Sequence, residues 1–299
     1  MSSENNSTGI PLHSLAGYQH LEFWLNSENF QEVEHSGSID PAAVRELAES
    51  SLKFDADLGP LNAGMGHLQL ARSWLTESEN LLRQNASTEQ SSISAGLTTS
   101  ERHFNTAVSL FRTSGECEFQ VIGLLRRAAL WRVCVGFCGR SRDIQRDKMV
   151  AHHESLASAD LEQAERFAKN GPMLIWKIEA ALERARLFLT LAQIEEGNGR
   201  DSPMDADNSD PDPRLSASIS GSSSSEPAKN YREQAQQKLD EAKTLIKQTE
   251  KPYVPHVPDW DEWEPPEYVG VFKEGDIVGY HCRDGEIERL QKLLDDAGS

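Results

Sequence analysis

The stretch "GLLRRAALWR" at residues 123–132 has a near copy, "AALERARLFL", at residues 180–189. The two copies begin 57 residues apart, and each places an alanine three positions before a large aromatic residue. Residues at that spacing share one face of an α-helix, where the small side chain admits a neighbouring helix and the aromatic ring fills the gap beside it. The pair therefore predicts that the chain repeats one helical unit.

Aligning the chain on these aromatic residues extends the repeat to four members. They lie 50, 57 and 57 residues apart: Trp24, Trp74, Trp131 and Phe188. Small residues precede the last three by eight and by three positions: Gly66 and Ala71, Gly123 and Ala128, Ala180 and Ala185. The first member fits less well, because Leu21 stands where the second small residue is expected.

A second helix is expected after each of these helices, marked by a large-small-large stripe with three-residue spacing. The stripes are Phe104-Ala107-Leu110, Leu161-Ala164-Phe167 and Leu239-Ala242-Leu245. The second helix of the first unit is expected in "DPAAVRELAESSLKF", with Asp40 as N-cap and Pro41 at the first helical position. The pattern predicts an all-α fold, an α-solenoid of about four helical hairpins with disordered inserts.

Polar composition predicts where the hairpins are interrupted. Residues 200–228 offer almost no large apolar side chain, so we expect this tract to be disordered and dispensable. The expected organisation is a flexible N-terminus at 1–10, repeat hairpins at 11–198 with a polar insert near 84–100, an acidic Ser-rich insert at 199–229, the last second helix at 230–250, a Pro/Trp-rich strap at 251–276 and a C-terminal capping helix at 277–299. Packing of the strap along the solenoid is favoured over its exposure as a ligand for another protein.

Charge and composition exclude several classes of function. The 299 residues carry a net charge of -18, which opposes direct nucleic-acid binding because phosphates require a basic surface. Only residues 101–198, with 14 Lys/Arg against 13 Asp/Glu, have a charge balance that could attract an acidic partner. The N-terminus lacks the pattern of a secretory signal, and no segment has the roughly 18 apolar residues of a membrane helix. We expect a cytoplasmic protein with no membrane partner and reduced cysteines.

The catalytic and cofactor motifs that come closest each lack a required residue. "HHESL" at 152–156 begins like a zinc-protease motif, but Ala157 stands where the second histidine ligand belongs. "GMG" at 64–66 has no third glycine and follows no strand, and no phosphate loop or nucleophile elbow is present in the sequence. The sequence predicts no enzyme and no cofactor.

Two polar clusters have both a functional and a structural interpretation. Cys134 and Cys138 could hold a metal together with His152 or His153 and Cys282, but two buried thiols in an apolar stripe are favoured. The residues Tyr280, His281, Arg283 and Asp284 could form a polar site, but a role in capping and anchoring the end of the solenoid is favoured.

Several segments resemble a known family. "GLLRRAALWR", "ADLEQAERFAKNGPMLIWKIEAALERARLFL", "YREQAQQKLDEAKTLIKQT" and "GYHCRDGEIERLQKLL" are similar to the C-terminal tetratricopeptide-repeat region of bacterial signalling NTPases of the STAND/NB-ARC type and of maltose-regulator-like activators. The resemblance covers roughly residues 60–295, with units longer than the usual ~34 residues. It implies a bacterial protein whose repeats sense or scaffold, without the catalytic module.

We therefore predict a non-enzymatic protein-binding scaffold or sensor that uses a concave groove. The resemblance assigns the groove to the first helices, at positions that hold Arg72, Arg132 and Arg186. These arginines could bind an acidic peptide or a carboxylate, or they could instead pair with glutamates of neighbouring second helices. The alternative functions are a regulatory subunit for a signalling NTPase or transcription system on another chain and, more remotely, a metal-binding protein.

Overall fold

A computed structural model of the chain describes residues 41–84, 90–141, 143–170, 173–200, 226–252, 277–278 and 283–296. This part is all-helical, as predicted, apart from a two-residue antiparallel pairing of β1 (Lys251–Pro252) with β2 (Ile277–Val278). The chain divides into two compact units, Met1–Asn170 and Gly171–Ser299.

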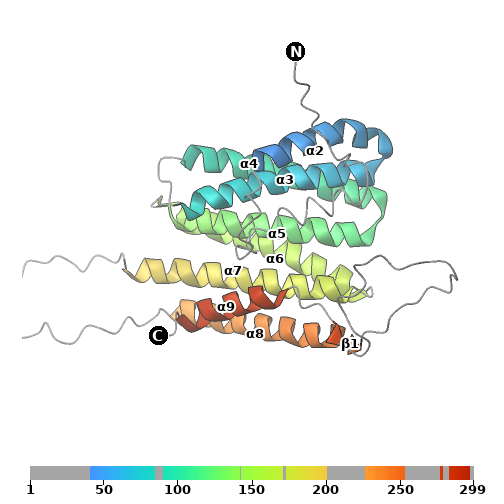
Figure 1. The fold of residues 1–299 in the computed structure, drawn as a ribbon. Helices are drawn as coiled ribbons and strands as arrows, with labels where there is room; N and C mark the ends of the chain where they lie inside the picture. The colour runs from blue at the N-terminus through green and yellow to red at the C-terminus, as the bar shows by residue number, and fades with distance from the viewer. Residues whose placement is uncertain are drawn as a thin grey trace, which may run out of the picture. The chain divides into compact units, whose positions relative to one another are not determined.

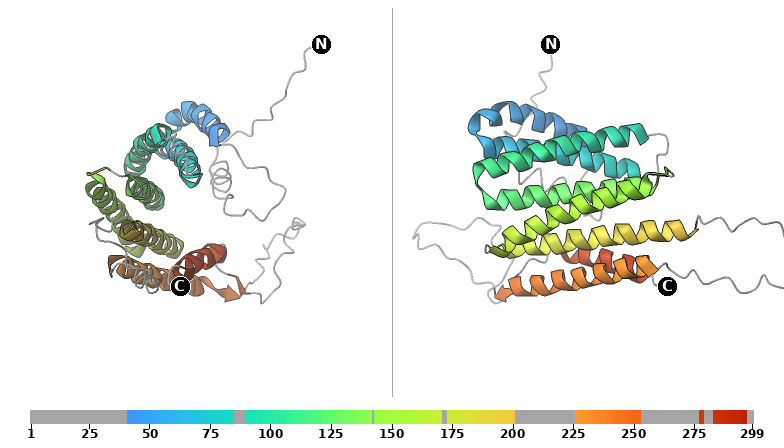
Figure 2. Two further views of the ribbon diagram at one scale, coloured as in Figure 1. Left: turned by 90° about the vertical axis from the view of Figure 1, so that its left-hand side faces the viewer. Right: turned by 180° about the vertical axis from the view of Figure 1, so that it is seen from behind.

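The first unit is a set of long helices in which each packs on the next (Figures 1 and 2). Its described elements are α2 (Pro41–Asp55), the short 3-10 helix η2 (Ala56–Leu58), α3 (Pro60–Arg83), α4 (Gln90–Ser114), α5 (Cys117–Gly139) and α6 (Arg146–Asn170). The α3–α4 and α5–α6 pairs form the most extensive contacts of the unit, and α2 packs on α3.

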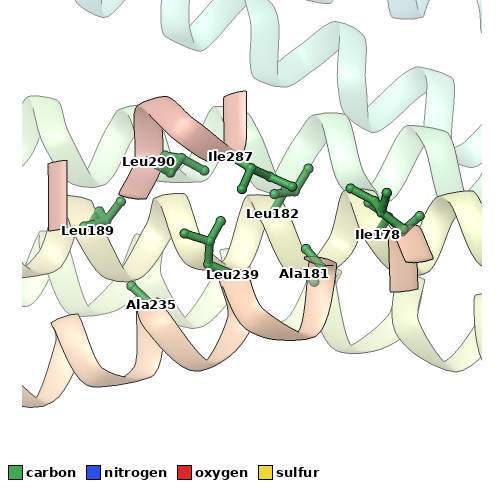
Figure 3. Close-up of a cluster of buried hydrophobic side chains, with 10 residues drawn as sticks. Ile178, Ala181, Leu182, Leu189, Ala235, Leu239, Ile287 and Leu290 are labelled. Carbon is green, nitrogen blue, oxygen red and sulfur yellow. The ribbon is translucent and has the colours of Figure 1, made fainter. Parts of the chain in front are cut away.

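The second unit consists of a helix pair and a shorter closing helix. Its helices are α7 (Leu174–Arg200), α8 (Glu226–Thr249) and α9 (Asp284–Asp296). Figure 3 shows the core of this unit, where Ile287 and Leu290 of α9 meet Leu182 of α7 and Leu239 of α8. The closing helix therefore packs on both members of the pair.

Two glycines with positive φ set helix ends in the first unit. Gly59 precedes α3 with φ 109°, and Pro60 follows it at the first helical position, where a missing N–H costs nothing. Gly115, with φ 77°, ends α4. Its N–H donates to the Arg112 carbonyl, so α5 can begin two residues later.

Small residues let three helices approach one another closely around Phe111 of α4. A Cβ added to Gly64 of α3 would lie 2.6 Å from the Phe111 ring, and one added to Gly123 of α5 would lie 3.0 Å from it. The "GMG" stretch is thus part of a helix, where its first glycine serves packing.

The repeat predicted from the sequence is matched by burial in the first helices α3, α5 and α7. The six small residues of the alignment are all buried in these helices: Gly66, Ala71, Gly123, Ala128, Ala180 and Ala185. Trp131 is 5% exposed, whereas Trp74 and Phe188 are half-buried. Trp24 lies outside the described residues.

The second-helix stripes are also found on helices. The first two residues of each stripe are completely buried: Phe104 and Ala107, Leu161 and Ala164, Leu239 and Ala242. Their last members, which are Leu110, Phe167 and Leu245, are half-buried. The predicted helix at Pro41 is present as α2, while its expected cap, Asp40, lies outside the described residues.

The polar insert predicted near 84–100 is wrong over most of its length, because α4 begins at Gln90. Ile93 and Leu97 are buried at i,i+4 spacing, and Ser100 donates a 2.7 Å hydrogen bond to the Ala71 carbonyl. A few buried apolar or small residues on one face are thus sufficient for a helix in a stretch of mainly polar composition.

The other predicted boundaries shift by a few residues. Helix α7 continues to Arg200 and α8 begins at Glu226, so both ends of the 199–229 insert are helical, and Ala228 is completely buried. The predicted helices at 230–250 and 277–299 correspond to α8 and α9 with the bounds given above. The N-terminus at 1–10, residues 201–225 and most of the strap (253–276) lie outside the described residues.

Candidate functional site

The three arginines predicted to form a binding groove lie on the first helices, but their surroundings differ. Arg72 on α3 is buried, with 7% exposure. Arg132 on α5 is half-buried and pairs with Glu79 of α3, with 3.4 Å between Nη2 and Oε1. These two belong to the first unit and Arg186 to the second, so a groove lined by all three stays a prediction.

Arg186 is held within the second unit by two carboxylates. Its guanidinium pairs with Glu183, one turn earlier on α7, and with Glu286 of α9, where Nε donates to Oε1 over 2.7 Å. Burial opposes charge on Arg186, but Glu286 and Glu183 outweigh it, so its pKa is raised. The predicted alternative, pairing with glutamates, describes this residue, although the partners come from α7 and α9 and not from a second helix.

Glu286 is the charged centre of this cluster. Burial favours its neutral form, but Arg186 and Arg283 outweigh that effect and lower its pKa to about 2. Arg283, just before α9, binds Glu179 of α7 through two hydrogen bonds of 2.6 and 2.9 Å. Arg283 thus ties the start of α9 to α7, as the anchoring interpretation predicts, while Tyr280 and His281 lie outside the described residues.

A second buried polar cluster joins three helices of the first unit. Arg127 of α5 donates to both carboxylate oxygens of Asp160 on α6, at 2.8 and 2.7 Å, and to Asn105 of α4 at 2.8 Å. Trp131 donates its indole N–H to the same carboxylate at 3.1 Å. Asp160 is 5% exposed, and three donors satisfy its carboxylate.

Trp131 also stacks on a histidine of α6. The ring centroids of Trp131 and His153 are 5.7 Å apart, with the planes 17° from parallel. Burial and the neighbouring His152 lower the pKa of His153, so the ring stays neutral at pH 7. The burial of Trp131 follows the predicted aromatic repeat, but its hydrogen bond was not predicted, because Asp160 has no sequence feature that marks it as the acceptor.

A histidine pair between α3 and α4 was also missed. The Nδ1 atoms of His67 and His103 lie 2.9 Å apart, and the ring centroids are 5.1 Å apart. Burial and the neighbouring charges lower both pKa values, that of His103 to about 4. Two neutral rings at this distance can share one N–H···N hydrogen bond.

The cysteines of α5 match the structural interpretation of the sequence. Cys134 and Cys138 are buried, and burial raises the pKa of both thiols, that of Cys134 to about 12. A thiol with so high a pKa is a poor nucleophile. No cluster of three metal-ligating side chains occurs among the residues that the structure describes, and Cys282 is not one of them.

Comparisons with known proteins add no further assignment. No family model, no curated protein and no solved structure matches the chain. The resemblance to tetratricopeptide-repeat regions therefore stays a prediction. Within the described ranges, no helix has the length and apolarity needed to cross a membrane.

Proposed function

We propose that this chain is a non-enzymatic protein-binding scaffold or sensor built as a tetratricopeptide-like α-solenoid. The observation that carries the proposal is the matched burial of small residues in α3, α5 and α7 at 57-residue spacing. Stacked hairpins of this kind expose successive first helices on one side, and such surfaces bind extended peptides or helices in other repeat proteins.

Among the three groove arginines, Arg132 is the best placed to contact a partner. Its side chain is 20% exposed, and its ion pair with Glu79 is long for a charge-assisted hydrogen bond. A partner carboxylate could replace Glu79 at a small cost, because a partly exposed pair of this kind contributes ~0–1 kcal/mol. Arg186 has two buried partners, so we assign it a structural role in the second unit.

The ligand class that follows is an acidic peptide. A guanidinium binds a carboxylate through two parallel N–H···O contacts, which the single ammonium of lysine cannot reproduce. The proposal is tested by selecting from a random peptide display library with the full chain as bait. We expect enrichment of peptides rich in Asp and Glu, and no enrichment over an unrelated acidic protein would contradict the proposal.

A further inference from the structure

The turn between α5 and α6 presents an isoleucine that no described part of the chain covers. Ile144 is 100% exposed, although the turn around it is hydrogen-bonded. The Gln145 N–H donates to the side chain of Asp143, and the Arg146 N–H donates to its carbonyl, both over 3.0 Å. Met149, in the first turns of α6, is also 43% exposed.

Basic residues flank this isoleucine in the sequence. Arg146 and Lys148 follow it at the start of α6, and Arg140 precedes it. Arg140 also donates a 2.7 Å hydrogen bond to the carbonyl of Leu82, next to the exposed Arg83 at the end of α3. We call residues 143–149 together with Arg83 and Arg140 the basic tip.

The two acidic residues of the basic tip have roles in the local backbone structure. Asp143 shapes the turn through the hydrogen bonds given above, and Asp147 lies in the first turn of α6, where the helix dipole favours a negative charge. The basic tip therefore keeps an excess of positive charge in a chain whose net charge is -18.

Helix α2 and the short helix η2 that follows it have an excess of the opposite charge. Glu46 and Glu49 are exposed on α2, Leu47 between them is 36% exposed, and Asp57 is exposed on η2. Lys53 is the exposed cation in this part of the chain. The extensive contacts of α2 with other described elements are those with α3 and η2. We call Glu46, Leu47, Glu49 and Asp57 the acidic face.

We propose that the basic tip of one copy of this chain docks on the acidic face of a second copy. Each patch combines an exposed apolar side chain with charges that complement those of the other patch, an arrangement that gives orientation and specificity. No ion pair between the two patches occurs within the described part of one chain. Each copy carries both patches, so a second copy supplies the complement of each.

Other occupants fit the charges less well. An anionic membrane or a nucleic acid would engage the basic tip alone and would meet Asp143 and Asp147 within it, whereas a second copy also accounts for the acidic face. The patches are small compared with the interfaces of permanent dimers, and the two copies repel each other overall. The self-association is therefore weak and weakens further as salt screens the charges.

The experiment is sedimentation velocity on the full chain at increasing concentration, in about 0.05 M and about 0.5 M salt. Ile144→Asp/Lys148→Glu reverses the tip, and Glu46→Lys/Glu49→Lys reverses the acidic face. All four side chains are exposed, so circular dichroism should show unchanged folding. We expect each variant alone to associate at least about tenfold more weakly than the wild type, and a mixture of the two to recover association.

The matched control is Arg166→Glu, which reverses an exposed charge on α6 outside the basic tip. Two results would overturn the inference: a wild-type chain that stays monomeric at every concentration, or association that the tip and face variants change no more than the control does. Arg132 belongs to neither patch. Loss of peptide binding in Arg132→Glu and loss of self-association in the tip variant are therefore separate outcomes.

Discussion

The two units bury arginine–carboxylate pairs in contrasting ways. In the first unit, Arg127 and Asp160 lie 33 residues apart on consecutive helices, so their pair stabilises a single hairpin. In the second unit, Arg186 and Glu286 lie 100 residues apart, and their pair holds a closing helix on α7. The first arrangement adds specificity to contacts that a helical hairpin makes anyway, whereas the second ties a distant helix to α7 beside the apolar contacts of Ile287 and Leu290.

The comparison predicts that the largest loss of stability from a single substitution occurs at Trp131, in the polar cluster of the first unit. Trp131→Ala removes a 5% exposed ring, its stacking on His153 and one donor to Asp160, and should lower the free energy of unfolding by ~3–5 kcal/mol. Trp131→Phe, which keeps most of the ring, should cost clearly less. Equal losses for the two variants in chemical denaturation would show that the indole N–H matters and the packing does not.

Breaking the cluster of the second unit should have a smaller and more local effect. Arg186→Met leaves Glu286 buried without its main partner and should cost ~3 kcal/mol, mainly through release of α9. Hydrogen exchange should show faster exchange in α9 and unchanged exchange in α3 to α6. Uniformly faster exchange in both units would contradict the local role assigned to this pair.

The two units should lose stability in different pH ranges. The first unit should respond at the higher pH, through its histidine pair. The pKa of His103 is about 4 in the folded chain, below the unfolded value of 6.5. Between these values the unfolded chain binds a proton that the folded chain does not, so the free energy of unfolding decreases as pH falls from 6.5 to 4. After allowance for solvent screening of half-buried rings, we expect a loss of ~1 kcal/mol. His103→Phe should flatten the pH dependence between these values, and an unchanged slope would contradict this assignment.

The closing helix should respond at lower pH. The pKa of Glu286 falls from 4.5 to about 2 on folding, so its contribution is complete above pH 4.5 and is lost as pH approaches 2. Glu286→Gln should remove this dependence. The release of α9 should be monitored by hydrogen exchange. Release that already occurs at pH 6 would contradict the assignment.

The smallest effect is expected from replacing residues 201–225, which join the end of α7 to the start of α8, with a linker of about five Gly and Ser residues. Shortening a polar connection changes the loop-closure entropy only slightly, so Tm should move by no more than a few degrees. Extending the deletion through Ala228 should cost more, because that residue is completely buried in α8. A collapse of the fold in the shorter deletion would show that the tract packs.

The helices that carry the aligned small residues could be predicted from the sequence. Gly123 and Ala180 are at equivalent positions because each must admit a neighbouring helix, and such a requirement leaves a pattern of residue types. Residues 90–100 were missed because a helix needs apolar contacts on one face only, and Ile93 and Leu97 are too few to stand out among serines and threonines.

The polar clusters could not be predicted in the same way. Nothing near Arg186 in the sequence indicates that its partner is Glu286, since the pairing depends on where α9 docks. His67 and His103 are likewise brought together only when α3 packs on α4. Their positions beside the aromatic residues of the repeat placed all three predicted arginines in one group, whereas packing gives them different surroundings.

The central claim, that the first helices bind an acidic peptide through Arg132, is tested most directly by calorimetric titration of a selected peptide into the full chain. Arg132→Glu should weaken binding roughly tenfold or more, the change expected when a charge-assisted hydrogen bond of ~1.5–3 kcal/mol is lost. The Arg166→Glu control should bind like the wild type. Equal affinities of the wild type and both variants would contradict the claim.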